Sequence, residues 1–219
     1  MAGGKKFKFQ GSLIALVTGF HGDSPSSPIS GISRADPCVV TETSHGRSSG
    51  DVVKFSGIGG MTELNDEIFV IERIDANSYS LVDVDSTGYN AYTSGGLVDE
   101  ATLSNFCELT DYQRNGGPKP EIPATSLCSV GAEYELGLPD YGTTQISFNF
   151  APQTAIQQAI RTFEASGDKL AVKVTLPKNG GIRTLLGFIQ QTSEAASVGG
   201  LWTGSVTLRN TGAPYDQAG

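Results

Sequence analysis

The residues best placed to do chemistry are three acids in the stretch AEYELGLPDYGTTQISFNF, residues 132–150. Two carboxylates that face each other across a sugar can hydrolyse a glycosidic bond, one as the acid and one as the base or nucleophile. Glu133 and Glu135, however, alternate on one face of an extended segment, too close in sequence to flank a substrate. Asp140 lies in a Pro-Asp-Tyr-Gly sequence, which is typical of a turn. We therefore expect a strand, a turn and a second strand with solvated acids, and no enzyme.

Two other motifs fail for lack of context. GRSSG at 46–50, beside His45, matches the nucleophile elbow of hydrolases, but that elbow needs a helix after it and DVVKF reads as a strand. DVDSTG at 83–88 begins like a calcium loop, yet its twelfth position is Ser94 instead of a bidentate Glu. Two histidines and three scattered cysteines match no zinc pattern. The sequence predicts no catalytic residue, no metal and no cofactor.

Composition restricts the partners. The 219 residues carry a formal net charge of −8, and an acidic protein is a poor ligand for phosphate backbones, although nucleic acid can slide past such a surface without sticking. Cys38, Cys107 and Cys128 form no C-x-x-C pair, which indicates a reducing compartment. No apolar run approaches the ~20 residues of a membrane span, so we expect no membrane segment.

The chain divides by composition. Residues 31–98 contain ten acids and four bases, and thus most of the negative charge. A linker rich in Pro, Ser and Gly, residues 21–31, precedes this block, and Ser-Gly-Gly ends it. We expect a small β-barrel domain at 31–96, inserted into a core domain made of 1–30 and 97–219.

Short runs rich in Val, Ile, Thr, Phe and Tyr predict a mainly β fold, a β-sandwich or barrel with one flanking α-helix. The helix is expected at 152–166, with Pro152 in its first turn and Gly167 just beyond its end. Strands are expected in the alternating FKF at 7–9, in GSLIALVTG, in NFCELTDYQRN and in TTQISFNF, and a hairpin at Asn179-Gly-Gly. GGPKPEIPAT at 116–125 reads as a loop. The expected strands of the insert are PCVVTET, GDVVKFSGI, EIFVIERI, NSYSLVDV and YNAYTSGG.

The order of these pieces resembles a known family. TSLCS, EYELGLPDYGTTQISFNF, the helix QQAIRTF, KLAVKVTLP, TLLGFIQQTSEAASVG and VTLRNTGAP follow one another as in the major tail tube protein of long, non-contractile-tailed bacteriophages. The inserted block is similar to the small first catalytic-cysteine half-domain (FCCH) of ubiquitin-activating enzymes. That similarity implies no ubiquitin chemistry, because no cysteine lies within 46–96.

The resemblance to tail tube proteins implies a structural subunit of the virion. Such proteins form hexameric rings that stack into a tube, through which DNA is ejected into the host. The implied partners are further copies of the chain, a tape measure protein in the lumen, initiator or baseplate and terminator proteins, and viral DNA in transit without specific binding. Assembly would take place in the bacterial host cytoplasm, and the insert would project from the tube exterior because it would obstruct the lumen.

Contacts between subunits or rings are expected from an N-terminal arm, the proline loop and the C-terminal tail. The candidates are Lys5, Lys6, Phe7, Phe9, Lys119, Pro120, Glu121, Ile122, Asp140, Tyr141 and Tyr215. The first alternative is a tail terminator or another ring protein of the virion. A second is a glycan-binding or adhesion module that uses Tyr79, Tyr89 and Tyr92 of the insert, although these tyrosines also suit barrel packing. A third is a tail-associated hydrolase that uses the acids of 133–140.

Overall fold

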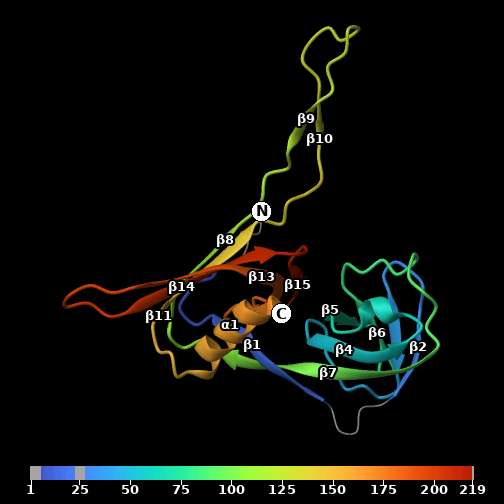
Figure 1. Ribbon diagram of the computed structural model, residues 1–219, viewed down its shortest axis with the longest axis horizontal. Helices are drawn as coiled ribbons and strands as arrows, with labels where there is room; N and C mark the ends of the chain where they lie inside the picture. The colour runs from blue at the N-terminus through green and yellow to red at the C-terminus, as the bar shows by residue number, and fades with distance from the viewer. Residues whose placement is uncertain (1–5, 23–27, 219) are drawn as a thin grey trace.

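The structure, a computed structural model, describes residues 6–22 and 28–218. Within them the fold is mainly β, as expected, and its body is one large antiparallel sheet of thirteen strands. Figure 1 shows a core half, a smaller lobe beside it and a thin two-stranded arm that leaves the body. The core-half strands are β1 (Leu13–Gly22), β7 (Ser94–Asn105), β8 (Leu109–Asn115), β11 (Thr143–Asn149), β12 (Lys169–Thr175), β13 (Ile182–Ala195), β14 (Thr203–Asn210) and β15 (Tyr215–Gln217).

A single long strand, β7, joins the two halves. Its first part pairs with β4 of the lobe, where Ser94 lies opposite Gly59, and its second part pairs with β1, where Asn105 lies opposite Ala15. The strand order is β2-β3-β6-β5-β4-β7-β1-β12-β13-β14-β11-β8, with β15 on β13. The lobe contributes β2 (Ile29–Ile32), β3 (Val39–Glu42), β4 (Val52–Gly59), β5 (Ile68–Arg73), β6 (Ser78–Leu81) and the short 3-10 helix η1 (Thr62–Leu64).

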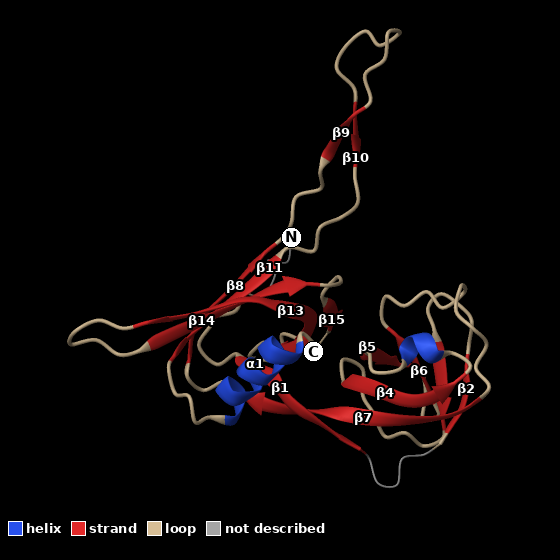
Figure 2. Ribbon diagram, in the orientation of Figure 1, coloured by secondary structure: helices blue, strands red, loops and turns tan. Residues whose placement is uncertain are grey.

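The core half packs its sheet against the helix α1 (Ala155–Ser166), which lies over β1 and β13 (Figure 2). Alternation in the sequence makes this possible: in β12, Leu170, Val172 and Val174 point to the buried side. On the helix, Ile156, Ile160 and Phe163 recur at the spacing of one face and pack into the same core.

The helix is shorter than the sequence predicts. It begins at Ala155 because Thr154 keeps an extended backbone and takes the N-cap position, so the expectation that Pro152 lies in the first turn is wrong. The C-terminal end is as expected: Gly167 adopts a left-handed conformation with φ of 74° and donates its N–H to the carbonyl of Phe163.

Three predicted strands in and around the core are wrong. NFCELTDYQRN is not one strand, because β7 ends at Asn105 and a turn separates it from β8. YNAYTSGG forms no strand before Ser94, where β7 begins. The alternating segment at Phe7–Gln10 is irregular, and the ring of Phe7 packs over Gly180 instead of pairing in a sheet. An alternating sequence does not show whether another strand has an unpaired edge to which the segment can hydrogen-bond.

The lobe has a hydrophobic core of its own, in which Phe55, Met61, Leu64 and Leu81 are fully buried. Ile29 and Val98, just outside the predicted boundaries of 31 and 96, belong to the same core. We propose that this lobe is the inserted domain, with limits a few residues wider than the composition indicates; we call it the insert below.

The insert contacts the core half through apolar and polar side chains besides the shared strand, and its Val52, Ile68 and Val70 are buried in the hydrophobic core of the core half. Lys169 forms an ion pair with Glu67, and the Lys173 ammonium lies 3.3 Å from the Asp51 carboxylate. The hydroxyl of Thr184 donates to the carbonyl of Gly50 over 3.2 Å. These contacts link β12 and β13 of the core half to the loops of the insert.

The proline loop at 116–125 is also different from the prediction. It contains a strand, β9 (Glu121–Pro123), which pairs with β10 (Tyr134–Leu136) in a separate two-stranded sheet. The strand expected before the Pro-Asp-Tyr-Gly turn therefore exists, but its partner is β9 and not β11. We call residues 118–138 the arm (Figures 1 and 2).

Two glycines of the insert allow a test of its folding. Gly57 and Gly60 both have positive φ, of 67° and 83°, but an added Cβ meets nothing at Gly57 and lies 2.1 Å from the Ala91 carbonyl oxygen at Gly60. We expect Gly57→Ala to lower the free energy of unfolding by about 1 kcal/mol through strain alone. Gly60→Ala adds a backbone overlap and is expected to cost roughly 2 to 4 kcal/mol. Urea unfolding followed by circular dichroism measures both, and equal costs would contradict the packing at Gly60.

Candidate functional site

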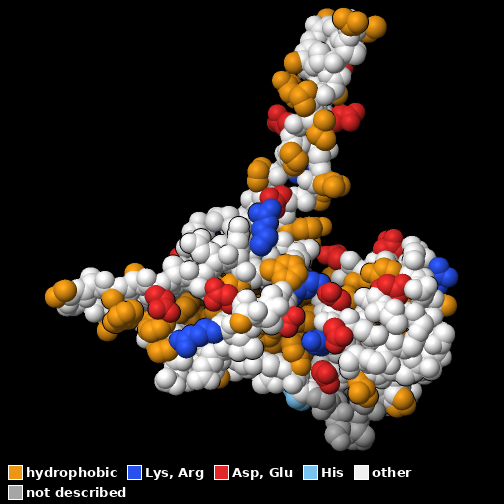
Figure 3. Space-filling view, in the orientation of Figure 1, with side chains coloured by type: hydrophobic (Ala, Val, Ile, Leu, Met, Phe, Trp, Pro, Cys, Tyr) orange, Lys and Arg blue, Asp and Glu red, His pale blue; other side chains and the backbone are white. Residues whose placement is uncertain are grey.

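The arm exposes apolar side chains that this chain does not cover. Every residue of β9 and β10 is exposed, and Leu127 and Val130 at the tip have no neighbours that shield them from solvent. Figure 3 shows hydrophobic side chains along the whole length of the arm. An isolated two-stranded ribbon is marginally stable in water. The exposed apolar residues of the arm are Ile122, Leu127, Val130, Tyr134, Leu136 and Leu138.

The base of the arm, in contrast, is fixed. The carboxylate of Asp140 accepts the N–H of Gly142 over 2.7 Å and pairs with the Arg209 guanidinium over 2.8 Å. The Gly142 N–H, and then Arg209, hold the pKa of the Asp140 carboxyl below its ordinary value. At Gly142, with φ of 74°, an added Cβ would lie 1.9 Å from the Asn115 carbonyl oxygen, so the two strands cross closely where the arm begins.

A second exposed apolar group lies at the end of the β13–β14 hairpin. Val198 and Leu201 are exposed in the connecting loop, and Trp202 is about half exposed. The indole packs on Phe150, with ring centroids 5.7 Å apart, and the guanidinium of Arg161 lies 6.0 Å from the centre of the Phe150 ring. The hairpin extends away from the body in Figure 3.

A groove lies beside the N-terminal segment of the body, with a volume of about 700 Å³. Its walls come from the N-terminal segment, β12, the β12–β13 turn, β8 and β15. Apolar side chains predominate among the lining residues, which include Phe7, Phe9, Ile14, Val174, Leu176 and Ile182. We call this feature the N-terminal groove.

The strand β8 is the end of the sheet in the core half. It pairs with β11 on one side, and no described strand pairs with the other. Terminal strands expose unpaired N–H and C=O groups, which are templates for another strand. This edge is therefore available to a second chain.

The motifs considered for chemistry have structural explanations. Glu133 accepts a hydrogen bond from the Ser129 hydroxyl in the arm, and both Glu133 and Glu135 are exposed. GRSSG lies in a loop before β4, and DVDSTG forms a turn in which Asp85 accepts the Thr87 N–H. Among the described residues, no group of three or more His, Cys, Asp or Glu is placed to hold a metal ion.

The insert instead uses its charged residues internally. Arg47 Nη1 donates to the carboxylate of Glu42 over 2.8 Å, and the Tyr79 hydroxyl donates to the other oxygen over 2.9 Å, with all three side chains buried. Burial, and then the Glu42 charge, raise the pKa of Tyr79. The backbone N–H of Arg47 donates to His45 Nδ1, so Nε2 carries the ring proton and donates to the Asp75 carbonyl.

The three tyrosines considered as glycan contacts pack inside the insert. Tyr79 is fully buried, Tyr89 is partly buried, and Tyr92 donates its hydroxyl to the carbonyls of Ile29 and Gly95. The structure thus favours the barrel-packing interpretation of these side chains.

The predicted contact residues fall into three places. The arm carries Lys119, Pro120, Glu121 and Ile122, and Asp140 and Tyr141 lie at its base. Phe7 and Phe9 line the N-terminal groove, and the exposed Lys6 directly precedes Phe7. Tyr215 is partly buried in β15 opposite Thr184, and Lys5 lies outside the described residues. Their contact roles stay predictions. The sequence analysis did not predict the exposed apolar residues at the tips of the arm and of the β13–β14 hairpin. Apolar residues beside glycine, in Leu-Cys-Ser-Val-Gly of the arm and Gly-Gly-Leu-Trp of the hairpin, could have indicated these exposed turns.

In the described residues no helix is long and apolar enough to cross a bilayer. The only cysteine of the insert among the described residues is Cys38, which is buried, and burial raises the pKa of its thiol. A buried thiol that stays protonated is a poor nucleophile.

One comparison with protein families finds a match that falls mainly on the insert. Residues 38–101 match the family "Ubiquitin-activating enzyme E1 FCCH domain", which confirms the expected similarity of the insert. The ubiquitin-like modifier-activating enzyme 1 of Oryctolagus cuniculus is 34% identical over 93 residues, and that of Homo sapiens is 33% identical. The match covers 40% of this chain and 9% of each enzyme, so it concerns one small module of those proteins.

Among solved structures, a chain of "Tail of empty GTA particle computed with helical refinement, C6 symmetry" is similar over 53% of this chain and 87% of its own length. The sequence identity is 21% and the TM-score is 0.40. A similarity this distant carries no argument about function.

The buried ion pair of the insert gives a stability prediction. Arg47→Met leaves the Glu42 carboxylate buried without its cation and is expected to lower the free energy of unfolding by about 3 to 5 kcal/mol. Adding Glu42→Gln removes the buried charge and keeps an acceptor for Tyr79, so the double variant should recover at least half of the loss. Urea unfolding is the measurement, and Arg34→Met, at an exposed position, is the control.

The arm base gives a pH prediction. The pKa of Asp140 in the folded protein lies below its ordinary value of 3.8, so the stabilisation is fully present above that value and is lost as the pH falls through the lowered pKa. We expect amide hydrogen exchange at Gly142, corrected for its intrinsic rate, to accelerate in that acidic range. Asp140→Ala should exchange fast at every pH without a step, whereas Asp111→Ala should behave as the native chain. A step that survives in Asp140→Ala would assign it to another group.

Proposed function

We propose that this protein is a structural, non-catalytic subunit of a bacteriophage tail tube, which assembles with its own copies into stacked hexameric rings. The observation that carries the proposal is the arm. Its apolar side chains are exposed to solvent and are not packed against any other described part of the chain. Contact with a partner would bury these side chains and stabilise the two-stranded ribbon.

The sheet supports self-assembly as well. The free edge of β8 is seven residues long, and its positions are partly buried or exposed, none fully buried. Pairing this edge with a neighbouring copy satisfies its backbone groups and continues the sheet from one subunit to the next. When two different surfaces of identical copies bind each other, the assembly either closes into a ring or grows into an open filament.

The charge distribution fits a channel for DNA. The net charge of −8 gives no general attraction for phosphates, so DNA in transit would not be held. The insert carries most of this charge and, as a lobe beside the core half, fits the exterior of a tube. In this proposal the further partners are a tape measure protein in the lumen and initiator or baseplate and terminator proteins at the ends, and the subunit is located in the virion tail after assembly in the host cytoplasm.

Negative-stain microscopy of the purified full chain tests the proposal, and we expect long hollow rods of uniform width. Leu127→Ser/Val130→Ser removes the burial of two apolar side chains, worth roughly 3 to 6 kcal/mol per contact, and should abolish the rods at the same protein concentration. Ile74→Ser/Leu97→Ser, which alters two exposed apolar residues elsewhere, is the matched control and should leave the rods intact.

Other outcomes would contradict the tube. Single rings that never stack would indicate a terminator or another ring protein. A monomer that does not polymerise at high concentration, even with added initiator protein, would overturn self-assembly altogether.

A further inference from the structure

We propose that the arm of one copy docks in the N-terminal groove of another copy. This inference rests on the proposed self-assembly and names the two surfaces that meet. The arm is an apolar ribbon without a cover, and the groove is an apolar hollow of about 700 Å³, a volume that accommodates several side chains.

The charges of the two surfaces are complementary. The arm, residues 118–138, contains three acids, Glu121, Glu133 and Glu135, and one base, Lys119, so its net charge is negative. The groove is lined in part by the N-terminal segment, which is the most basic stretch of an otherwise acidic chain. Lys8 lines the groove, Lys6 precedes Lys8 by two residues, and both side chains are exposed. Acidic and basic surfaces of this kind steer association and fix its register.

The acids of the groove do not cancel this positive charge. Asp216 lines the groove, but both of its carboxylate oxygens accept hydrogen bonds from the guanidinium of Arg183, over 2.5 and 2.6 Å. Arg183 and Asp216 therefore balance each other, and the lysines of the N-terminal segment remain in excess.

The groove also contains a hydrogen-bonding atom that the described residues leave unsatisfied. The Tyr112 hydroxyl is buried there and finds no partner in the described part of the chain. Burial raises the pKa of Tyr112, so its hydroxyl is a donor that needs an acceptor. A ribbon with exposed carboxylates and backbone groups supplies both donors and acceptors.

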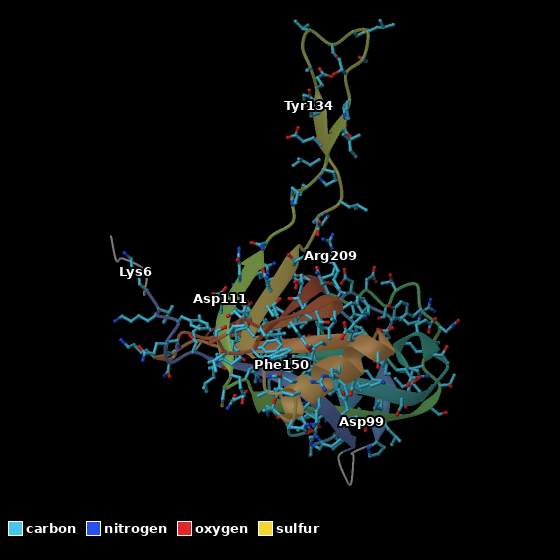
Figure 4. The ribbon with its side chains drawn as sticks, turned by 60° about the vertical axis from the view of Figure 1, so that its left-hand side comes forward. Lys6, Asp99, Asp111, Tyr134, Phe150 and Arg209 are labelled. Carbon is cyan, nitrogen blue, oxygen red and sulfur yellow. The ribbon has the colours of Figure 1, made fainter. Side chains whose placement is uncertain are left out.

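The arm does not reach the groove of its own chain. Figure 4 shows Tyr134 far out on the arm, Arg209 near the arm base and Lys6 away from both, beyond Asp111. The hydrogen bonds of Asp140 and the close crossing at Gly142 hold the base, so that the ribbon points away from the body. The occupant must be the arm of a second copy.

Charge reversal tests this pairing without altering a buried residue. Lys6→Glu/Lys8→Glu makes the groove acidic, and Glu133→Lys/Glu135→Lys makes the arm basic. Each variant alone brings like charges together, and we expect its self-association, measured by sedimentation velocity, to weaken at least tenfold. Mixed in equal amounts, each arm meets a groove of opposite charge in the other variant, and association should return to within threefold of the native chain.

The matched control is Arg34→Glu/Lys54→Glu, which makes the same charge change on the insert and should leave association unchanged. Thermal melting of each variant verifies that it folds. Association of the single variants at the native level, or a mixture that stays as weak as its components, would overturn the pairing of arm and groove.

The two proposals fail in different ways. Rods that persist in both charge-reversed variants would overturn the arm–groove contact and leave the tube intact. Restoration by mixing, together with native assemblies that end at small discrete oligomers, would support the contact and overturn the tube.

Discussion

The structure depends on the pairing of β7 with two strands at once. Because β7 continues for twelve residues from β4 into β1, the hydrogen bonds of one strand hold the insert and the core half in the same sheet. The ion pairs of Lys169 and Lys173 then add contacts on a second side. The hydrophobic core of the core half also includes Val52, Ile68 and Val70 of the insert, so the two halves share buried apolar surface as well as a strand.

The sequence predicts the fold class and the main elements because these depend on local patterns. Alternation in KLAVKVT, the amphipathic spacing around Ile156 and Ile160, and the left-handed position of Gly167 are properties of neighbouring residues. The insert was recognisable for the same reason, since its charge and its turns differ from those of the flanking chain. The limits that we propose for the insert differ from the composition boundaries, because β7 belongs to both halves and carries no break in composition at Gly96.

The candidate site was harder to predict. The sequence indicates contact residues near Phe7, Lys119 and Asp140, but three prolines concealed β9, whose partner β10 is eleven residues further along the chain. Exposure of Leu127 or Trp202 is not a property of local sequence, because the same side chains would be buried if a strand passed over them. The charge of the N-terminal segment was visible, whereas the groove beside it is made by segments from both ends of the chain.

The place where the chain enters and leaves the insert has a consequence of its own. Gly22, the last residue of β1, lies opposite Asp99 of β7 in the antiparallel register, so the two connections start from neighbouring positions. Antiparallel neighbours have Cα atoms only about 5 Å apart. A direct hairpin between them would join β1 to β7 without the insert, but it would remove Val52, Ile68 and Val70 from the core of the core half. A replacement module at this position therefore needs two adjacent ends and an apolar surface that covers the same part of the core.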